Sequence, residues 1–309
     1  MNRVPTVLVT GAEGLVGRHI VRVLVDAGAC QVAAVSRSSA QPAAERLTWV
    51  KADLQQAAEV LTMERIRADA IVHTAAVLPR THNDAAAAAA NQAMDEHVFA
   101  LARESNASVI YISSLSVYED CSTPWTESTQ VHPMSAYAAS KYRSERALQA
   151  LGLRGAILRI SSPYSAFDIS RPGVLYHFVR EAVAERRLVV NGKGERAQDF
   201  VHGSDIGRAV VAVLQYWQAQ PAKTAVETFN IAAGRPTSMT ELAELVVSCS
   251  GASGIVVHEG AEAEPSYRAE LSVSRAKEIL QWQPQVELRA GLEQLIRHMR
   301  GSYEDWLAV

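Results

Sequence analysis

The feature that most constrains the fold of this chain is an alternation of short apolar runs with longer amphipathic stretches through its first half. We expect β-strands at residues 6–9, 31–35, 48–51, 70–73, 108–112 and 156–160. Between the first two, residues 16–26 carry apolar side chains at helical spacing, which predicts a helix with one buried face. This order is typical of βαβ units, whose parallel strands form one sheet covered by helices on both sides.

Beyond residue 165 the alternation is looser. Helices are expected at 174–185, 240–248, 273–280 and 288–300, and a strand at 227–231. The alanine-rich stretch 84–103 is also expected to be helical, because alanine is the best helix former. We therefore predict an α/β fold, a Rossmann-type doubly wound parallel sheet with a smaller α/β C-terminal substrate lobe. Residues 1–165 would form the Rossmann domain, with 201–236 returning to it, and 166–200 and 237–309 the lobe.

Composition narrows the class of partner. The chain has 309 residues, and 30 Lys and Arg nearly balance 33 Asp and Glu. A hydrophobic content of 48% excludes disorder, and the lack of a basic excess argues against nucleic acid. The three cysteines are scattered, no signal peptide or membrane span is expected, and no spacing suggests a metal site. We therefore expect a cytoplasmic protein with a small-molecule partner.

The strongest local motif is the glycine-rich segment TGAEGLVG, residues 10–17, which joins the first predicted strand to the first predicted helix. Glycines let such a turn tighten and let the backbone approach a pyrophosphate, whose charge then lies at a helix N-terminus. A glycine pattern alone is weak, but the strand before it and the helix after it favour dinucleotide binding over a plain turn.

The end of the second predicted strand suggests which dinucleotide is bound. NAD sites commonly have an acid there, which binds a ribose hydroxyl. This strand ends in Ser36 and Arg37, with no carboxylate, and a guanidinium suits a 2′-phosphate. We therefore predict NADP, with NAD as the alternative; Arg37 as a solvated loop residue is the competing interpretation. Asp53, after the third strand, is expected to bind the adenine amino group or to cap a turn.

Tyr137 and Lys141 lie four residues apart and would share one face of a helix. A phenol ionises near pH 10 in water, and a fixed ammonium beside it stabilises the phenolate. The YxxxK spacing alone is common in helices, where a structural salt bridge of the lysine is the usual interpretation. Its position after the fifth predicted strand and after Ser113 and Ser114 favours catalysis.

With these motifs the chain resembles the extended short-chain dehydrogenases/reductases of the NAD-dependent epimerase/dehydratase family, whose best-known members act on nucleotide sugars. The likeness spans nearly the whole length. The matching residues are Gly11, Gly14, Gly17, Asp53-Leu54, His73-Thr74-Ala75-Ala76, Asn91, residues 111–118, Tyr137, Lys141, Arg159, Asp199-Phe200-Val201-His202, Phe229-Asn230-Ile231 and Trp282-Gln283-Pro284.

The resemblance implies roles for individual residues. Ser114 would orient the reacting oxygen, Tyr137 would be the acid/base, and Lys141 would bind the nicotinamide ribose and stabilise the Tyr137 phenolate. A hydride would pass between the cofactor and a carbinol or ketone carbon. The cofactor would be held by Gly11, Glu13, Gly14, Leu15, Val16, Gly17, Ser36, Arg37, Asp53, Leu54, Thr74, Ala75, Ala76, Asn91, Ile112, Tyr137, Lys141 and Pro163. The substrate would be held by Ser116, Tyr118, Ser162, Tyr164, Arg196 and Gln198.

Departures from the family pattern narrow the expected reaction. Dehydratases of the family have an Asp-Glu pair after the catalytic Ser/Thr, where this chain has Leu115 and Ser116, so a dehydratase is not expected. The arginine that grips the substrate diphosphate is Gln198 here, and Arg196 is the candidate to replace it.

Three functions remain open from the sequence. The first is an NAD(P)-dependent nucleotide-sugar epimerase or 4-ketoreductase. The second is an NADP-dependent reductase or dehydrogenase of a non-nucleotide carbonyl or sugar acid, and the third is a non-catalytic cofactor-binding protein. A homodimer through the helices over 84–103 and 136–151 is also expected, from the resemblance and from their small-residue faces.

Overall fold

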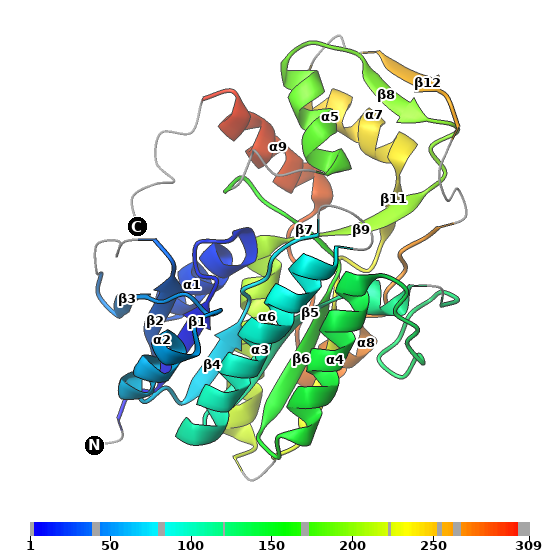
Figure 1. Cartoon of the computed structure of the whole chain (residues 1–309). Helices are drawn as coiled ribbons and strands as arrows, with labels where there is room; N and C mark the ends of the chain where they lie inside the picture. The colour runs from blue at the N-terminus through cyan, green and yellow to red at the C-terminus, as the bar shows by residue number, and fades with distance from the viewer. Residues whose placement is uncertain are drawn as a thin grey trace.

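Seven parallel strands form the central sheet of this computed structural model, which describes residues 3–38, 44–79, 84–119, 121–167, 173–221, 224–251, 255–261 and 267–301. The strand order is β10-β6-β5-β4-β1-β2-β3 (Figure 1). Their bounds are β1 (Thr6–Thr10), β2 (Gln31–Ser36), β3 (Leu47–Lys51), β4 (Ala70–His73), β5 (Ser108–Ser114), β6 (Gly155–Ile160) and β10 (Val226–Ile231). Every pair within the sheet is parallel. The predicted Rossmann-type doubly wound sheet is confirmed.

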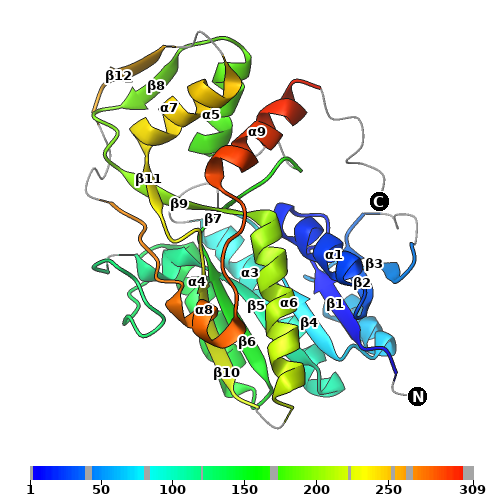
Figure 2. The same cartoon turned by 180° about the vertical axis from the view of Figure 1, so that it is seen from behind.

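Helices cover both faces of this sheet. On one face lie α2 (Ala57–Thr62), α3 (Ala85–Ser105) and α4 (Ala136–Ala150), and on the other α1 (Leu15–Ala27), α6 (Gly203–Ala219) and α8 (Ser274–Leu280) (Figures 1 and 2). Each strand supplies both cores, because successive side chains point to opposite faces. In β1, Val7 and Val9 belong to the core under α1 and α6, and Leu8 to the core under α2, α3 and α4.

A second, smaller part lies beyond the carboxyl ends of the strands, at the top of Figure 1. It contains the helices α5 (Val174–Val183), α7 (Met239–Ser250) and α9 (Leu288–Met299) and the paired strands β8 (Leu188–Asn191) and β12 (Val256–Glu259). The strands β7 (Ser162–Tyr164), β9 (Ala197–His202) and β11 (Pro236–Ser238) form a third sheet between the two parts. The upper part has its own apolar core.

Helices α6 and α8 are two of the elements that differ from the sequence-based expectations. Helix α6 was not predicted, although Ile206, Val210, Val213 and Trp217 recur at helical spacing on its buried face. Helix α8 falls within 237–309, the range expected for the lobe, yet it packs on the central sheet, because Ala276 and Leu280 complete the core beside α6. That part of the expected division is therefore wrong. Among the described residues, no helix is both long and apolar enough to cross a membrane.

Candidate functional site

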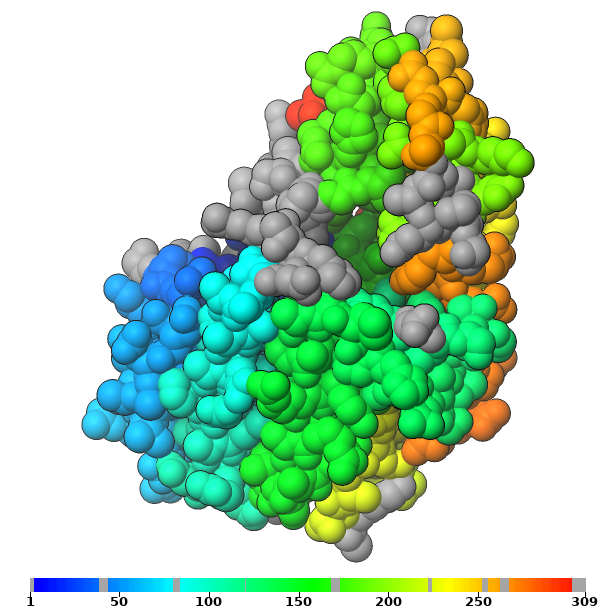
Figure 3. Space-filling model, turned by 45° about the vertical axis from the view of Figure 1, so that its right-hand side comes forward, coloured from blue at the N-terminus to red at the C-terminus, as the bar shows by residue number. Residues whose placement is uncertain are grey.

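A cleft of about 680 Å³ lies at the carboxyl ends of the central strands, where ligands bind in open α/β sheets. Figure 3 shows the surface hollowed between the lower and the upper parts of the molecule. Of the residues expected at the site, the cleft is lined by Gly11, Glu13, Gly14, Leu15, Val16, Gly17, Ser36, Arg37, Asp53, Leu54, Thr74, Ala75, Ala76, Ile112, Ser114, Ser116, Tyr137, Lys141, Ser162, Pro163 and Gln198. Asn91, Tyr118, Tyr164 and Arg196 do not line it.

The glycine turn between β1 and α1 has no room for side chains at two of its glycines. Gly11 has a φ of +63°, and a Cβ there would lie 2.7 Å from the Cα of Ala75. A Cβ on Gly17 would overlap the carbonyl oxygen of Gly11. The turn therefore brings the first backbone N–H groups of α1 close to the cleft, and such groups have no partner within a helix. This geometry fits a bound pyrophosphate.

Glu13 places a carboxylate at the end of β2. The hydroxyl of Ser38 donates to its two carboxylate oxygens at 2.7 Å and 2.6 Å, and the hydroxyl of Ser36 also donates to it. Arg37, between the two serines, is exposed at the edge of the cleft. The absence of a carboxylate in the sequence of this strand end is thus offset by one from the glycine turn.

Of the two roles expected of Asp53, the structure shows the capping of a turn. Its carboxylate accepts a hydrogen bond from the backbone N–H of Gln55 at 3.0 Å, which caps the turn after β3. The residue is half-buried and lines the cleft beside Leu54. The adenine contact predicted for Asp53 stays a prediction.

Asn91 supports the cleft from behind instead of lining it. Its side-chain oxygen accepts a hydrogen bond from the N–H of Val77 at 2.7 Å, and its amide donates to the carbonyl of Val77 at 2.9 Å. Asn91 is buried, so the expected contact with the cofactor is not supported. It holds the loop after β4, whose residue Thr74 donates to the carbonyl of Thr10 at 2.7 Å.

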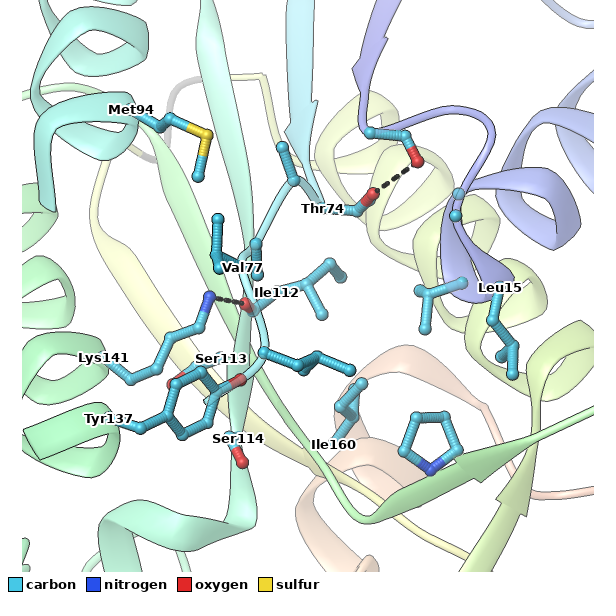
Figure 4. A pocket seen from close by; sticks show the side chains of 18 of the residues that line it. Leu15, Thr74, Val77, Met94, Ile112, Ser113, Ser114, Tyr137, Lys141 and Ile160 are labelled. Carbon is cyan, nitrogen blue, oxygen red and sulfur yellow. Dashed lines mark hydrogen bonds between the residues drawn. The ribbon is translucent and has the colours of Figure 1, made fainter. Parts of the chain in front are cut away.

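Tyr137 and Lys141 extend from α4 toward the end of β5, where Ser114 lies (Figure 4). The N-terminus of α4 is held by Ser135, whose hydroxyl accepts from the N–H of Ala138 at 3.1 Å. The ammonium of Lys141 is buried and donates to the carbonyl of Ile112 at 3.1 Å. The hydroxyl of Ser114 accepts from the N–H of Ser116 at 3.2 Å. A phenol, an ammonium and a hydroxyl thus lie on one side of the cleft.

A buried polar network lies beneath Lys141. The carboxylate of Asp95 accepts hydrogen bonds from the ring of His73 at 2.7 Å, from the hydroxyl of Tyr111 at 2.8 Å and from that of Ser144 at 2.5 Å. Lys141 Nζ lies 4.7 Å from the centroid of the Tyr111 ring. Burial opposes ionisation of Asp95, but the hydrogen bonds and the Lys141 charge outweigh it and lower the pKa of this carboxyl. The network places a negative charge behind the lysine.

Tyr118 belongs to the core. Its side chain is fully buried, and its hydroxyl donates to Asn230 at 2.7 Å and accepts from Arg159 at 2.9 Å. Arg159 forms a buried pair with Glu145 at 2.6 Å, which joins β6 to α4. Burial raises the pKa of Tyr118 to about 12. The predicted substrate contact of Tyr118 is not supported, because its side chain is buried and does not line the cleft.

Tyr164 and Arg196 also point elsewhere. Tyr164 is 1% exposed and packs against Gly291 in the core of the upper part. The guanidinium of Arg196 lies 4.8 Å from the centroid of the Tyr267 ring. Tyr267 lines the cleft, and Arg196 does not. The substrate contacts predicted for Tyr164 and Arg196 are therefore not supported.

The cleft also contains residues that sequence reasoning missed. Ser38, one of the two hydroxyl residues that flank Arg37, also lines the cleft, although it was not among the expected site residues. The exposed apolar side chains of Val77 and Leu78 follow β4, and Met94 comes from α3 (Figure 4). Tyr267 joins the cleft from a distant segment with no motif of its own. Among the described residues, no group of His, Cys, Asp and Glu is arranged to hold a metal ion.

Comparison with known proteins gives a consistent result. Residues 7–232 match the model of the family described as NAD dependent epimerase/dehydratase family. The chain is 29% identical to a UDP-glucose 4-epimerase of Azospirillum brasilense, over 93% of this chain and 90% of that one. It is 26% identical to a dTDP-4-dehydro-6-deoxy-D-allose reductase of a Streptomyces species, over 96% of each. A solved UDP-glucose 4-epimerase of Thermotoga maritima, in complex with UDP-glucose, superposes with a TM-score of 0.84 at 23% identity, over 96% of this chain and 99% of that one.

Proposed function

The chain belongs to the NAD dependent epimerase/dehydratase family, and from this membership we propose that it is an NAD(P)-dependent nucleotide-sugar epimerase or 4-ketoreductase. It is an enzyme of the extended short-chain dehydrogenase/reductase type, and its relatives include both activities. The observation that carries the proposal is the convergence of Tyr137, Lys141 and Ser114 on the cleft that the glycine turn opens into.

The residues present fit a nicotinamide dinucleotide. Gly11 and Gly17 leave the backbone bare at the start of α1, where a pyrophosphate is favoured by unpaired N–H groups and the helix dipole. Ser36, Arg37 and Asp53 surround the end of the cleft expected for the adenosine, and Tyr137 and Lys141 the end expected for the nicotinamide. When bound, the dinucleotide supplies the hydride acceptor or donor.

Tyr137 is proposed to move the proton that accompanies the redox step. In the direction of oxidation its phenolate accepts the proton of a sugar hydroxyl, and in the direction of reduction its hydroxyl returns one to the ketone oxygen. Ser114 holds the same oxygen by a hydrogen bond and keeps it within reach of the phenol. The ammonium of Lys141, anchored on β5, stabilises the phenolate between the two steps.

Water elimination is not part of the proposed reaction. It requires an acid and a base beside the serine. The residues after Ser114 are Leu115, which has no ionisable group, and Ser116, whose hydroxyl does not ionise near neutral pH. Leu115 and Ser116 both line the cleft, so this part of its wall has no carboxylate.

The choice between NAD and NADP depends on the groups at the end of β2. Arg37 favours a 2′-phosphate, which is the reason for the NADP prediction. The Glu13 carboxylate beside it favours ribose hydroxyls, which can donate to it.

The test of the reaction is whether purified protein interconverts epimeric sugar nucleotides without added reduced cofactor. An epimerase returns the hydride to its substrate and consumes none. Stoichiometric consumption of NADH or NADPH by a 4-keto sugar nucleotide would instead establish the ketoreductase. Absence of both activities across UDP, GDP and dTDP sugars would contradict the proposal.

A second candidate is a reductase or dehydrogenase of a carbonyl or sugar acid without a nucleotide. The observation in its favour is that neutral Gln198 lines the cleft while Arg196 does not, which leaves this position without a charge for a diphosphate. Nucleoside diphosphates that bind a native protein raise its melting temperature. Failure of UDP, GDP and dTDP to do so would favour this candidate.

We further propose a homodimer and a substrate lobe. The helices α3 and α4 lie side by side on one face of the sheet (Figure 1), and this pair is the expected dimer surface. Sedimentation at micromolar concentration tests it, and a monomeric mass would contradict it. The parts of residues 166–200 and 237–309 that form the upper core are proposed to close over the substrate.

A further inference from the structure

A carboxylate reaches the end of β2 from a different part of the chain. Glu13 lies in the glycine turn between β1 and α1, 23 positions before Ser36 in the sequence. The hydroxyl of Ser38 bridges both of its oxygens, at 2.7 Å and 2.6 Å, and the N–H of Ser38 donates to the oxygen of Ser36 at 3.1 Å. The hydroxyls thus hold the acid in one place.

This place is where the two dinucleotides differ. In Rossmann-type sites, an acid at the end of the second strand binds the 2′-hydroxyl of the adenosine ribose, and an arginine nearby accommodates the 2′-phosphate of NADP. In this chain the described residues at the strand end are Ser36, Arg37 and Ser38, and all three line the cleft together with Glu13. The strand itself has no acid at this end, but the carboxylate of Glu13 lies beside it.

We propose that Glu13 makes this enzyme selective for NAD over NADP. Its carboxylate accepts a hydrogen bond from the ribose 2′-hydroxyl of NAD and repels the dianionic 2′-phosphate of NADP. The inference rests on the dinucleotide binding included in the proposed function. It reverses the NADP preference expected from the sequence of β2.

Arg37 is the group that opposes this selectivity. Its side chain is exposed, so solvent and salt screen its attraction for a phosphate. Glu13 is half-buried and held by the two serine hydroxyls, so its charge is screened less and cannot turn away at low cost. We therefore expect the repulsion between Glu13 and a 2′-phosphate to exceed the attraction between Arg37 and that phosphate.

The experiment measures the dissociation constants of NAD and NADP by calorimetry at one ionic strength, for the native chain and for Glu13→Gln. We expect the native chain to bind NAD at least about tenfold more tightly than NADP. The glutamine keeps an oxygen that accepts from the ribose but loses the charge, so the preference should shift toward NADP by about tenfold or more.

Two further variants serve as controls. Glu278→Gln removes the same charge from an exposed position on α8, which packs beside β10 at the edge of the sheet farther from β2. This variant should leave the ratio of the NAD and NADP dissociation constants unchanged. Arg37→Ala in the Glu13→Gln background should weaken NADP binding and spare NAD. A third measurement uses the native protein alone: the dinucleotide released by heating is identified by mass spectrometry. We expect it to be NAD.

Tighter binding of NADP by the native chain, or an unchanged ratio in a folded Glu13→Gln protein, would overturn the inference about Glu13 and leave the proposed function intact. Selective NAD binding without turnover of any sugar nucleotide would have the opposite meaning: the function fails while the role of Glu13 stands. Failure to bind either dinucleotide would overturn both.

Discussion

The ammonium of Lys141 donates a hydrogen bond to the carbonyl oxygen of Ile112 at 3.1 Å, which ties the helix that carries Tyr137 to the strand that ends at Ser114. A second hydrogen bond, from the hydroxyl of Ser113 to the carboxylate of Glu145 at 2.6 Å, also joins α4 to β5, so the three residues proposed for catalysis depend on the packing of these two elements. Because the lysine is buried, its charge acts on the phenol through a poorly screened environment.

Substitution of Tyr137 by phenylalanine should abolish turnover while the dinucleotide still binds. The variant loses only the hydroxyl, so we expect a fall in kcat of about 100-fold or more. The dissociation constant of the dinucleotide, measured by calorimetry, should stay close to the native value. Tyr142→Phe, five residues further along α4, provides a matched control. Native-like turnover in Tyr137→Phe would contradict the role of this residue.

Gly17→Ala should damage dinucleotide binding more than Gly14→Ala does. A Cβ at position 17 overlaps the carbonyl oxygen of Gly11, whereas a Cβ at position 14 lies 3.2 Å from that atom and meets no other neighbour. We expect the first variant to bind about tenfold or more weakly, because the turn must shift away from the pyrophosphate. Equal affinities of the two variants would show that the close approach is unimportant.

The buried pair of Arg159 and Glu145 should behave as a unit in unfolding experiments. Arg159→Met leaves the Glu145 carboxylate with Ser113 as its remaining hydrogen-bond donor in the described structure, and we expect a loss of about 3 kcal/mol or more in the free energy of unfolding. Adding Glu145→Leu removes the stranded charge and should recover part of that loss. A double variant that is as unstable as the sum of the two single variants would argue against coupling.

The stability of the fold should fall in mild acid because of two histidines near the start of α6. Burial, reinforced by charges on neighbouring residues, lowers the pKa of His19 to about 3, and burial lowers the pKa of His202 to about 4. Between pH 6.5 and 4 the unfolded chain therefore binds protons that the folded chain does not. Each histidine should reduce the unfolding free energy by up to about 1.4 kcal/mol per pH unit in this window.

Urea titrations at pH 7, 6 and 5 measure this effect, since stability should be highest at pH 7. His19→Gln removes one of the two groups and should make the decline between pH 6 and 5 shallower. The variant is compared by its slope, because its absolute stability changes as well. An identical slope in the native chain and the variant would show that His19 is protonated normally in the folded state.

Much of the fold was predictable from local patterns. The strands of the central sheet are short β-branched runs between helical stretches, and strands buried on both faces must be continuously apolar. The expected strand at 227–231 is β10, which extends the sheet beside β6. Helix α6 was missed because its polar first turn, Gly203 to Asp205, follows a strand directly, and His202 caps it in place of a more usual residue.

Much of the candidate site was predictable as well, because a turn and a helical spacing carry it. The glycine turn and the Tyr137–Lys141 pair depend on residues within one local segment, and the structure brings both to the same cleft. The structure does not support the ligand contacts expected of Asn91, Tyr118, Tyr164 and Arg196. A motif gives the position of a side chain in the chain, but whether that side chain faces the cleft or the core depends on the packing of neighbouring elements.

The sequence by itself determined the alternation of strands and helices, the bare glycine turn and the helical spacing of Tyr137 and Lys141, since these follow from steric rules and periodicities within a few residues. Only the tertiary structure decided what meets at the end of β2. Glu13 belongs to the turn after β1, and the parallel pairing of β1 with β2 places its carboxylate on Ser36 and Ser38. The charge that an NADP phosphate would meet is therefore set by contact in space and not by the order of residues along β2.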